Sequence, residues 1–296
     1  MGAFDGRTMF ISGGSRGIGE AIAVAAAREG ANVAIAAKTD QPHPKLPGTI
    51  HTAVEVVEAA GGRGLALVCD IRNEEDVLSA VDKTVAAFGG IDFCVNNASA
   101  IQLTGTSATD VKRYDLMTGI NSRGTFVVTK ACLPHLLKSD HAHILTMSPP
   151  LDFNPQWFRN HPAYSLAKYG MSMLTMAWAA EFEGKIAANC LWPRTPIDTA
   201  AVRNLLGGAS MANQSRTPAI MGDAAAAILR KGADFTGWCC MDDLVLAAQG
   251  ETDFEQYAVT PGGKLQDDFF FPHETPAAAE AGGSYGWRAP LLDGLD

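Results

Sequence analysis

The sequence predicts a single α/β domain of the Rossmann type, with a doubly wound, mostly parallel sheet and helices on both faces. Up to about residue 195, short β-type apolar runs alternate with longer segments of helical period, as in a series of βαβ units. The first apolar run leads into a glycine-rich turn. With 296 residues, 47% of them hydrophobic, the chain can bury a full core. We expect residues 1–250 to form this domain and residues 251–296 to form a tail.

The individual elements follow from the hydrophobic period. The expected strands are Thr8 to Ser12, Asn32 to Ala37, Gly64 to Cys69, Asp92 to Val95, His143 to Met147 and Ala187 to Trp192. The expected helices are Gly17 to Glu29, Ile50 to Ala60, Glu74 to Phe88, Asp110 to Leu137 and Ala163 to Phe182. Residues 39–48, 149–162 and 195–217 break the alternation and are expected to be surface loops, which often carry function.

Composition excludes several classes of protein. The formal net charge is −9 and no Lys/Arg cluster occurs, which argues against a nucleic-acid partner. Six cysteines are present without CxxC or zinc-like spacing, so we expect reduced thiols and no metal site. No apolar run approaches the roughly 20 residues that span a bilayer, and no leader pattern opens the chain. We therefore expect a cytoplasmic protein without a membrane partner.

A glycine-rich segment, SGGSRGIG at residues 12–19, joins the first expected strand to the first expected helix. Its glycines allow a tight turn, a close approach of the backbone to a ligand and close helix packing, while the helix N-terminus favours a pyrophosphate. The same letters elsewhere could be only a turn, and the position between strand and helix favours a dinucleotide site. The residues expected to contact the cofactor here are Gly13, Ser15, Arg16, Gly17, Ile18 and Gly19.

The end of the second expected strand indicates which dinucleotide is bound. An NAD site usually has Asp or Glu there, to bind the ribose hydroxyls, whereas this chain has Lys38. A cation at that place attracts the 2′-phosphate of NADP, and Arg16 is expected on the same side of the adenosine pocket. NADP is therefore favoured and NAD remains possible, because Lys38 could also be a solvated lysine at a strand end.

Two further strand ends contribute to the expected site. Asp70 and Ile71 follow the third strand, and Asn97 and Ala98 follow the fourth, at the edge where open α/β sheets bind ligands. Asp70 could accept a hydrogen bond from the adenine amine. The neighbouring Asn96 is better explained as a residue that pins the strand, and Asn97 could have the same purpose.

Tyr164 and Lys168 are the residues best placed for chemistry. A spacing of four puts both on one face of the expected helix, one turn apart. An ammonium close to a phenol favours the phenolate, which lowers the high phenol pKa toward the range useful for acid-base catalysis. A YxxxK pair is common by chance on protein surfaces. Here it comes one strand after Ser148, whose hydroxyl could hydrogen-bond a carbonyl oxygen.

Asn121 is an unusual residue for the middle of the helix expected to precede the fifth strand. Either its side chain or a local kink should have a purpose there. A proton relay held together by water is one such purpose.

Taken together, these residues resemble the short-chain dehydrogenase/reductase family. GGSRGIG, Asp70, NNAS, Asn121, Ser148, YSLAK and Pro193 occur in that family's order over about residues 5–245. The resemblance implies a catalytic tetrad of Asn121, Ser148, Tyr164 and Lys168, with Tyr164 as proton donor or acceptor and Lys168 also on the nicotinamide ribose. It further implies cofactor contacts from Tyr164, Lys168, Pro193, Thr195 and Ile197. Family members are commonly homodimers or homotetramers that pair the two long helices.

Other runs, including MSPPL and LWPRT, resemble one subgroup of the family. Some members of that subgroup carry an additional sterol-carrier domain, for which we expect no room in this chain. Three features depart from the family pattern. Arg194 stands where the family usually has glycine, Ser99 replaces the last glycine of NNAG, and the loop at 149–162 is longer.

The expected function is that of an NADP-dependent oxidoreductase acting on an alcohol or carbonyl carbon. Apolar side chains suggest a hydrophobic small-molecule substrate: Met147, Leu151, Phe153, Trp157, Phe158 and Met211. The alternative is a dinucleotide-binding regulatory or scaffold protein whose catalysis has decayed, an idea prompted by Arg194. In the tail, Phe269, Phe270 and Phe271 should dock on the protein as an extended segment, since three adjacent rings in water forfeit burial.

Overall fold

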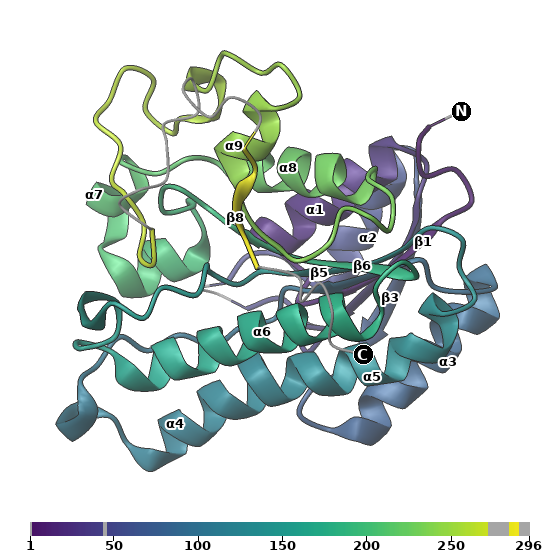
Figure 1. Cartoon of the computed structure of the whole chain (residues 1–296), viewed down its shortest axis with the longest axis horizontal. Coiled ribbons are helices and arrows are strands. Elements are labelled where there is room, and N and C mark those ends of the chain that lie inside the picture. The colour runs from purple at the N-terminus through teal and green to yellow at the C-terminus, as the bar shows by residue number, and fades with distance from the viewer. Residues whose placement is uncertain (1, 44–45, 272–283, 290–296) are drawn as a thin grey trace.

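The computed structural model describes residues 2–43, 46–271 and 284–289 (Figure 1). One sheet has the strand order β3-β2-β1-β4-β5-β6-β7-β8, in which only the β7–β8 pair is antiparallel. The strands are β1 Thr8–Ser12, β2 Asn32–Ala37, β3 Arg63–Val68, β4 Phe93–Asn96, β5 Ala142–Thr146, β6 Ile186–Trp192, β7 Trp238–Met241 and β8 Gly286–Arg288. The chain reverses its direction across the sheet between β1 and β4, which is where doubly wound sheets bind ligands.

Helices cover both faces of the sheet, as Figure 1 shows. The α-helices are α1 Gly17–Arg28, α2 Ile50–Ala59, α3 Glu74–Phe88, α4 Val111–Thr118, α5 Gly124–Leu136, α6 Pro162–Glu181, α7 Gly208–Ala212, α8 Ala219–Leu229 and α9 Asp242–Ala247. One core cluster joins α1, α2 and α8 to one face of the sheet. A second joins α3, α5 and the end of α6 to the other face. The predicted Rossmann-type architecture is confirmed.

The six strands predicted up to residue 192 are present, each within one residue of its predicted bounds, whereas the elements after residue 195 were missed. The predicted bounds of β1, β2 and α3 are those of the structure. The single helix predicted from Asp110 to Leu137 is interrupted, because a π-helical turn at Gly119–Arg123 separates α4 from α5. Strand β7 and helices α7, α8 and α9 were not predicted, and α7 lies in the 195–217 segment that was expected to be a loop. Strand β8 lies in the predicted tail and yet extends the sheet, because its backbone pairs with β7.

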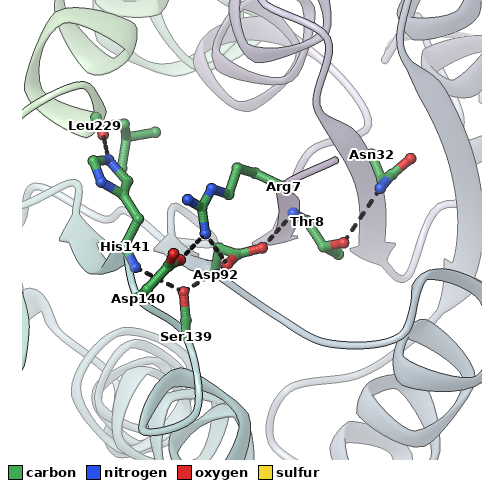
Figure 2. Close-up of polar contacts among 8 residues, drawn as sticks. All are labelled: Arg7, Thr8, Asn32, Asp92, Ser139, Asp140, His141 and Leu229. Carbon is green, nitrogen blue, oxygen red and sulfur yellow. Dashed lines mark hydrogen bonds and ion pairs between the residues drawn. The ribbon is translucent and has the colours of Figure 1, made fainter. Parts of the chain in front are cut away.

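The amino ends of three central strands are held together by a polar network, shown in Figure 2. Arg7, just before β1, forms ion pairs with Asp92 before β4, at 3.2 Å, and with Asp140 before β5. The Asp92 carboxylate also accepts hydrogen bonds from the Thr8 backbone N–H at 2.8 Å and the Ser139 hydroxyl at 2.5 Å. These contacts fix the strand ends opposite the glycine-rich turn, which leaves the carboxyl ends of the strands for the site.

Candidate active site

The glycine-rich turn after β1 has a backbone that only glycine fits. Gly13 and Gly17 have positive φ angles of 71° and 58°, in the region that disfavours larger side chains. A Cβ on Gly13 would lie 2.8 Å from the Ala98 Cα, and one on Gly19 would lie 2.5 Å from the Asn97 Nδ2. Helix α1 begins at Gly17 without a side-chain cap, so its first N–H groups are available to an anion. The turn therefore fits the pyrophosphate of a dinucleotide.

Side chains at the end of β4 hold this turn in place. Asn97 Nδ2 donates hydrogen bonds to the backbone oxygens of Gly13, at 2.9 Å, and Ser12, at 3.2 Å. Asn96 Nδ2 donates instead to Thr129 Oγ1 of α5 at 2.9 Å. The prediction that Asn96 pins the strand is therefore confirmed. Asn97 holds the backbone of the glycine-rich turn in place.

A cleft of about 1300 Å³ opens at the carboxyl ends of the strands. It is lined by many of the residues predicted to bind the cofactor, which are Gly13, Ser15, Arg16, Gly17, Ile18, Gly19, Lys38, Asp70, Ile71, Asn97 and Ala98. Sequence reasoning missed other parts of its wall, namely Thr39, Ser99, Ala100, Ile101, Asp198 and Thr199. Thr39 and Thr199 lie in loops that broke the predicted alternation, and Ser99 to Ile101 directly continue a predicted strand end.

The part of the cleft at the ends of β2 and β3 carries a group of charges. The Lys38 ammonium, at the end of β2, lies 3.3 Å from an Asp70 carboxylate oxygen, and Arg72 binds the same carboxylate at 2.5 Å. Arg72 and Lys38 hold the pKa of Asp70 well below its ordinary value. Arg16 donates hydrogen bonds to the backbone oxygens of Pro47, at 2.8 Å, and Gly48, at 2.7 Å. The loop after β2 is thereby tied to the glycine turn.

Lys168 is buried, and neither it nor Tyr164 or Ser148 belongs to the wall of the cleft. Both Tyr164 and Lys168 belong to α6 and are buried. The Lys168 Nζ donates a hydrogen bond to the Met147 backbone oxygen at 2.7 Å and lies 5.1 Å from the centre of the Trp192 ring. Burial lowers the pKa of Lys168 to about 8, although the nearby carboxylate of Asp268 acts in the opposite direction. The amine is therefore positioned by the end of β5 and not by Tyr164.

The Tyr164 hydroxyl makes no hydrogen bond to any residue within the described ranges, while its ring is 5% exposed. Its aromatic neighbours include Phe270, whose ring centre lies 6.3 Å away. Burial raises the pKa of Tyr164, and the negative charge of Asp268 raises it further. The expected lowering of the pKa by Lys168 is not found in this conformation, because desolvation of the phenol dominates.

The other two predicted catalytic residues, Ser148 and Asn121, are buried, and their side chains form hydrogen bonds with residues other than Tyr164 and Lys168. The Ser148 hydroxyl, just past β5, donates to Cys190 Sγ at 3.2 Å. The Asn121 amide lies in the π-helical turn and makes both of its hydrogen bonds with the Ala100 backbone, at 2.8 and 3.0 Å. No hydrogen bond within the described residues joins either side chain to Tyr164. The tetrad therefore stays a prediction.

The segment after β6 contains three residues that were predicted to bind the cofactor. Pro193, Thr195 and Ile197 are buried, and the cleft wall begins at Asp198. Arg194 is directed elsewhere: its guanidinium pairs with Asp243. Contacts of Pro193, Thr195 and Ile197 with a nicotinamide remain a prediction.

The structure places the residues predicted to line the substrate pocket in different surroundings. Trp157 and Phe158 pack against the cluster that contains Tyr164. Phe153 is 69% exposed, so its predicted place in the lining is wrong: the loop directs it to solvent. Met147 belongs to the core beneath the sheet. The predicted docking of the phenylalanines of the tail is confirmed by Phe270, which has no exposed surface, although the segment is a turn and not extended.

This combination defines a class of protein. A glycine-rich turn at the switch point of a doubly wound sheet, together with a Tyr/Lys pair one turn apart on one helix, is typical of a dinucleotide-dependent oxidoreductase. No helix among the described residues is both long and apolar enough to cross a membrane.

Comparisons with known proteins identify the family. The family model described as enoyl-(acyl carrier protein) reductase matches residues 13–228. The chain is 53% identical over 293 residues to hydroxysteroid dehydrogenase-like protein 2 of Xenopus tropicalis, covering 99% of this chain and 70% of that protein. This chain belongs to the short-chain dehydrogenase/reductase family, whose enzymes use NAD(P).

Solved structures agree with this assignment. A short chain dehydrogenase from Mycobacterium thermoresistibile matches with a TM-score of 0.86 and 50% identity, covering 91% of this chain and 96% of that one. Carveol dehydrogenase from Mycobacterium avium, crystallised in complex with NAD, matches with a TM-score of 0.70 and 22% identity, covering 81% of this chain and 97% of that one. The second comparison shows the shared fold.

Proposed function

We propose that this protein is an NADP-dependent carbonyl reductase or alcohol dehydrogenase for a hydrophobic substrate, with Tyr164 as the acid/base. The observation that carries the proposal is the Tyr164 hydroxyl, which has no hydrogen-bond partner among the described residues although its ring is buried. Ala100 and Ile101 pack against the Tyr164 cluster and also line the cleft. The cluster that contains Tyr164 thus shares Ala100 and Ile101 with the wall of the cleft, which supports a site that extends from the glycine turn toward the phenol.

Tyr164, Ser148 and Lys168 have separate tasks in this proposal, and Lys168 has two. Tyr164 donates its proton to the substrate oxygen in reduction and accepts it in oxidation. Ser148 polarises the carbonyl, exchanging its weak bond to the Cys190 sulfur for a stronger one to oxygen. Lys168 holds the nicotinamide ribose, and its charge opposes the effect of burial on Tyr164. NADP, when bound, supplies or receives the hydride.

Asn121 is a positioning residue in this proposal. By holding Ala100 it fixes the loop that separates the cleft from Tyr164. A water held near this turn remains the proposed relay for the proton.

The preference for NADP is supported by the charge at the end of β2. Lys38 is the residue there, and it faces the adenosine end of the cleft. A 2′-phosphate would offer the ammonium a stronger partner than the Asp70 carboxylate, which already binds Arg72.

We expect the Lys38→Asp variant to bind NADP at least about tenfold more weakly, since it loses one charge-assisted hydrogen bond and gains a repelling charge. Binding of NAD should change much less. The measurement is a fluorescence titration of both reduced cofactors against both proteins. Lys83→Asp is the control, because Lys83 is also an exposed lysine but lies on α3 and does not line the cleft. Equal affinity of the unmodified protein for the two cofactors would contradict the proposal.

The substrate is proposed to be a hydrophobic small molecule, such as a fatty or terpenoid aldehyde, an acyl thioester or a sterol. Trp157, Phe158 and Leu151 pack around the Tyr164 cluster and make its surroundings apolar. A panel of such compounds, followed through the absorbance of NADPH, tests the function directly. Turnover of none of them with either cofactor would favour the alternative, a decayed dinucleotide-binding protein.

We further propose a homodimer or homotetramer formed through the α4, α5 and α6 face. Large apolar side chains are exposed on these helices: Val111, Tyr114, Phe126, Leu166 and Met173. Such a patch is typical of an interface between subunits. A cytoplasmic location is supported by the cysteines, all six of which are buried and free.

The oligomer should dissociate when charges are placed on this face. We expect Phe126→Glu combined with Met173→Glu to sediment as a monomer at micromolar concentration, because the charges would be buried without partners. Val68→Glu combined with Leu78→Glu is the control, since these exposed side chains lie on β3 and α3. A monomeric unmodified protein, measured by sedimentation velocity, would refute the assembly.

A further inference from the structure

The segment Asp268–Phe271, here named the aromatic strap, packs directly against Tyr164. Phe270 is completely buried, although it lies in neither a helix nor a strand. Among the described residues, six rings have centres 5.2 to 6.5 Å from that of Phe270, those of Trp157, His161, Tyr164, Tyr169, Trp192 and the adjacent Phe269. A substrate oxygen that reaches the Tyr164 hydroxyl would bring its flanking carbons into these same surroundings.

The backbone of the aromatic strap is unusual at Phe270. Its φ angle is +61°, and among the described residues no other non-glycine residue has a positive φ. A bulky residue rarely adopts this conformation, and such strain persists only where the surrounding structure enforces it. The contacts that place the Phe270 ring on Tyr164 therefore outweigh a local backbone penalty.

Three contacts hold the strap at the end of β6. Trp192 Nε1 donates to the Phe269 backbone oxygen at 2.8 Å, and the Asp268 N–H donates to the Arg194 backbone oxygen at 2.9 Å. The Arg194 guanidinium lies 4.6 Å from the centre of the Phe271 ring. Arg194 is itself fixed by its ion pair with the buried Asp243. The residue that departs from the family pattern thus anchors the strap.

We propose that the aromatic strap is a lid over the substrate side of the site, and that Phe270 limits the size of the carbonyl compound that reaches Tyr164. The inference rests on the proposed function. In the conformation described, Phe270 occupies space beside Tyr164 that a bulky substrate would need. Small carbonyl compounds require little displacement of the ring, whereas bulky ones require the strap to lift from Arg194.

The test compares kcat/KM for a small ketone, butan-2-one, and a bulky one, 2-decalone. We expect Phe270→Ala to raise the ratio of bulky to small by about tenfold or more, since pocket volume of a few methylene groups discriminates to that extent. Phe271→Ala removes the stacking on Arg194 and should shift the ratio in the same direction. Phe4→Ala, which deletes a buried ring packed on Phe93, should leave the ratio unchanged. Equal ratios in Phe270→Ala and Phe4→Ala would overturn the lid.

A second readout separates failure of the lid from failure of the proposed function. Crystals of the full chain and of Phe270→Ala are soaked in 2-decalone, which requires no turnover. The lid predicts the ketone beside the Tyr164 hydroxyl in the variant and not in the unmodified protein. If neither ketone is turned over but the soaked variant holds 2-decalone there, only the proposed chemistry fails. If the variant holds none, or both proteins hold it equally, the lid is wrong.

Discussion

The Tyr164→Phe variant should lose turnover by about a thousandfold, because a positioned general acid contributes on that order to the rate. Its ring packing against Phe270 remains, since only the hydroxyl is removed. Cofactor affinity should therefore stay close to that of the unmodified protein, which places the loss in kcat. Steady-state kinetics over a series of substrate concentrations measure kcat. A separate titration with the cofactor measures its affinity.

Tyr169→Phe is a matched control for this experiment. Tyr169 lies on the same helix and its ring also contacts Phe270, at 5.2 Å, but its hydroxyl donates to the Asp152 backbone oxygen. The control should lose some stability and little activity. Retained turnover in Tyr164→Phe would mean that another group supplies the proton.

The second large effect is expected from Lys168→Met, which keeps the length of the side chain and removes its charge. Cofactor affinity should fall, because the ammonium is proposed to bind the nicotinamide ribose. Turnover should fall by at least about a hundredfold, because the ammonium is also proposed to favour the phenolate of Tyr164. The Met147 backbone oxygen also loses its donor, whereas the penalty for burying the lysine charge disappears. Thermal unfolding measures the net change in stability and separates it from the kinetic effect.

The pH dependence of cofactor binding gives an independent check on Lys168. Burial lowers its pKa to about 8, so the amine is charged below that pH and becomes neutral as the pH rises through it. Cofactor affinity should therefore decline above about pH 8 in the unmodified protein. Asp268 and Cys190 both face this amine and favour its charged form. Lys168→Arg, which stays charged, should bind without this decline, and an identical decline in that variant would point to another group.

The pH dependence of folding has the opposite sign. Because the pKa of Lys168 in the folded protein lies below its ordinary value, protonation is disfavoured by folding. The resulting loss of stability is present in full below about pH 8 and disappears as the pH rises toward the ordinary lysine value.

Much of the cofactor half of the site could be predicted, because it depends on local signals. The bounds of β1, β2 and α3 follow from runs of apolar residues and a helical period. Gly13 and Gly17 are read from sequence because their positive φ angles require glycine whatever packs around them. The pairing of Tyr164 with Lys168 on one helix likewise depends only on a spacing of four residues.

The direction of a side chain at a strand end depends on distant segments, so the hydrogen-bond partners of Ser148 and Asn121 could not be predicted from the sequence. Ser148 donates to Cys190, a residue of the next strand in the sheet, and Asn121 bonds to the loop after β4. Both partners depend on how distant segments pack. For the same reason the pKa of Tyr164 rises, although the neighbouring lysine alone predicts a decrease.

By itself, the sequence determined the doubly wound sheet, the glycine cradle and the residue types of the Tyr/Lys pair, since each depends on periodicity or on the conformational freedom of one residue. Only the tertiary structure decided that Arg194 contacts Asp243 and Phe271, that β8 joins the sheet, and that the Phe270 ring packs near Tyr164. These are contacts between segments far apart in the chain. Their free energy comes from burial and pairing across the fold, which no local pattern in the sequence encodes.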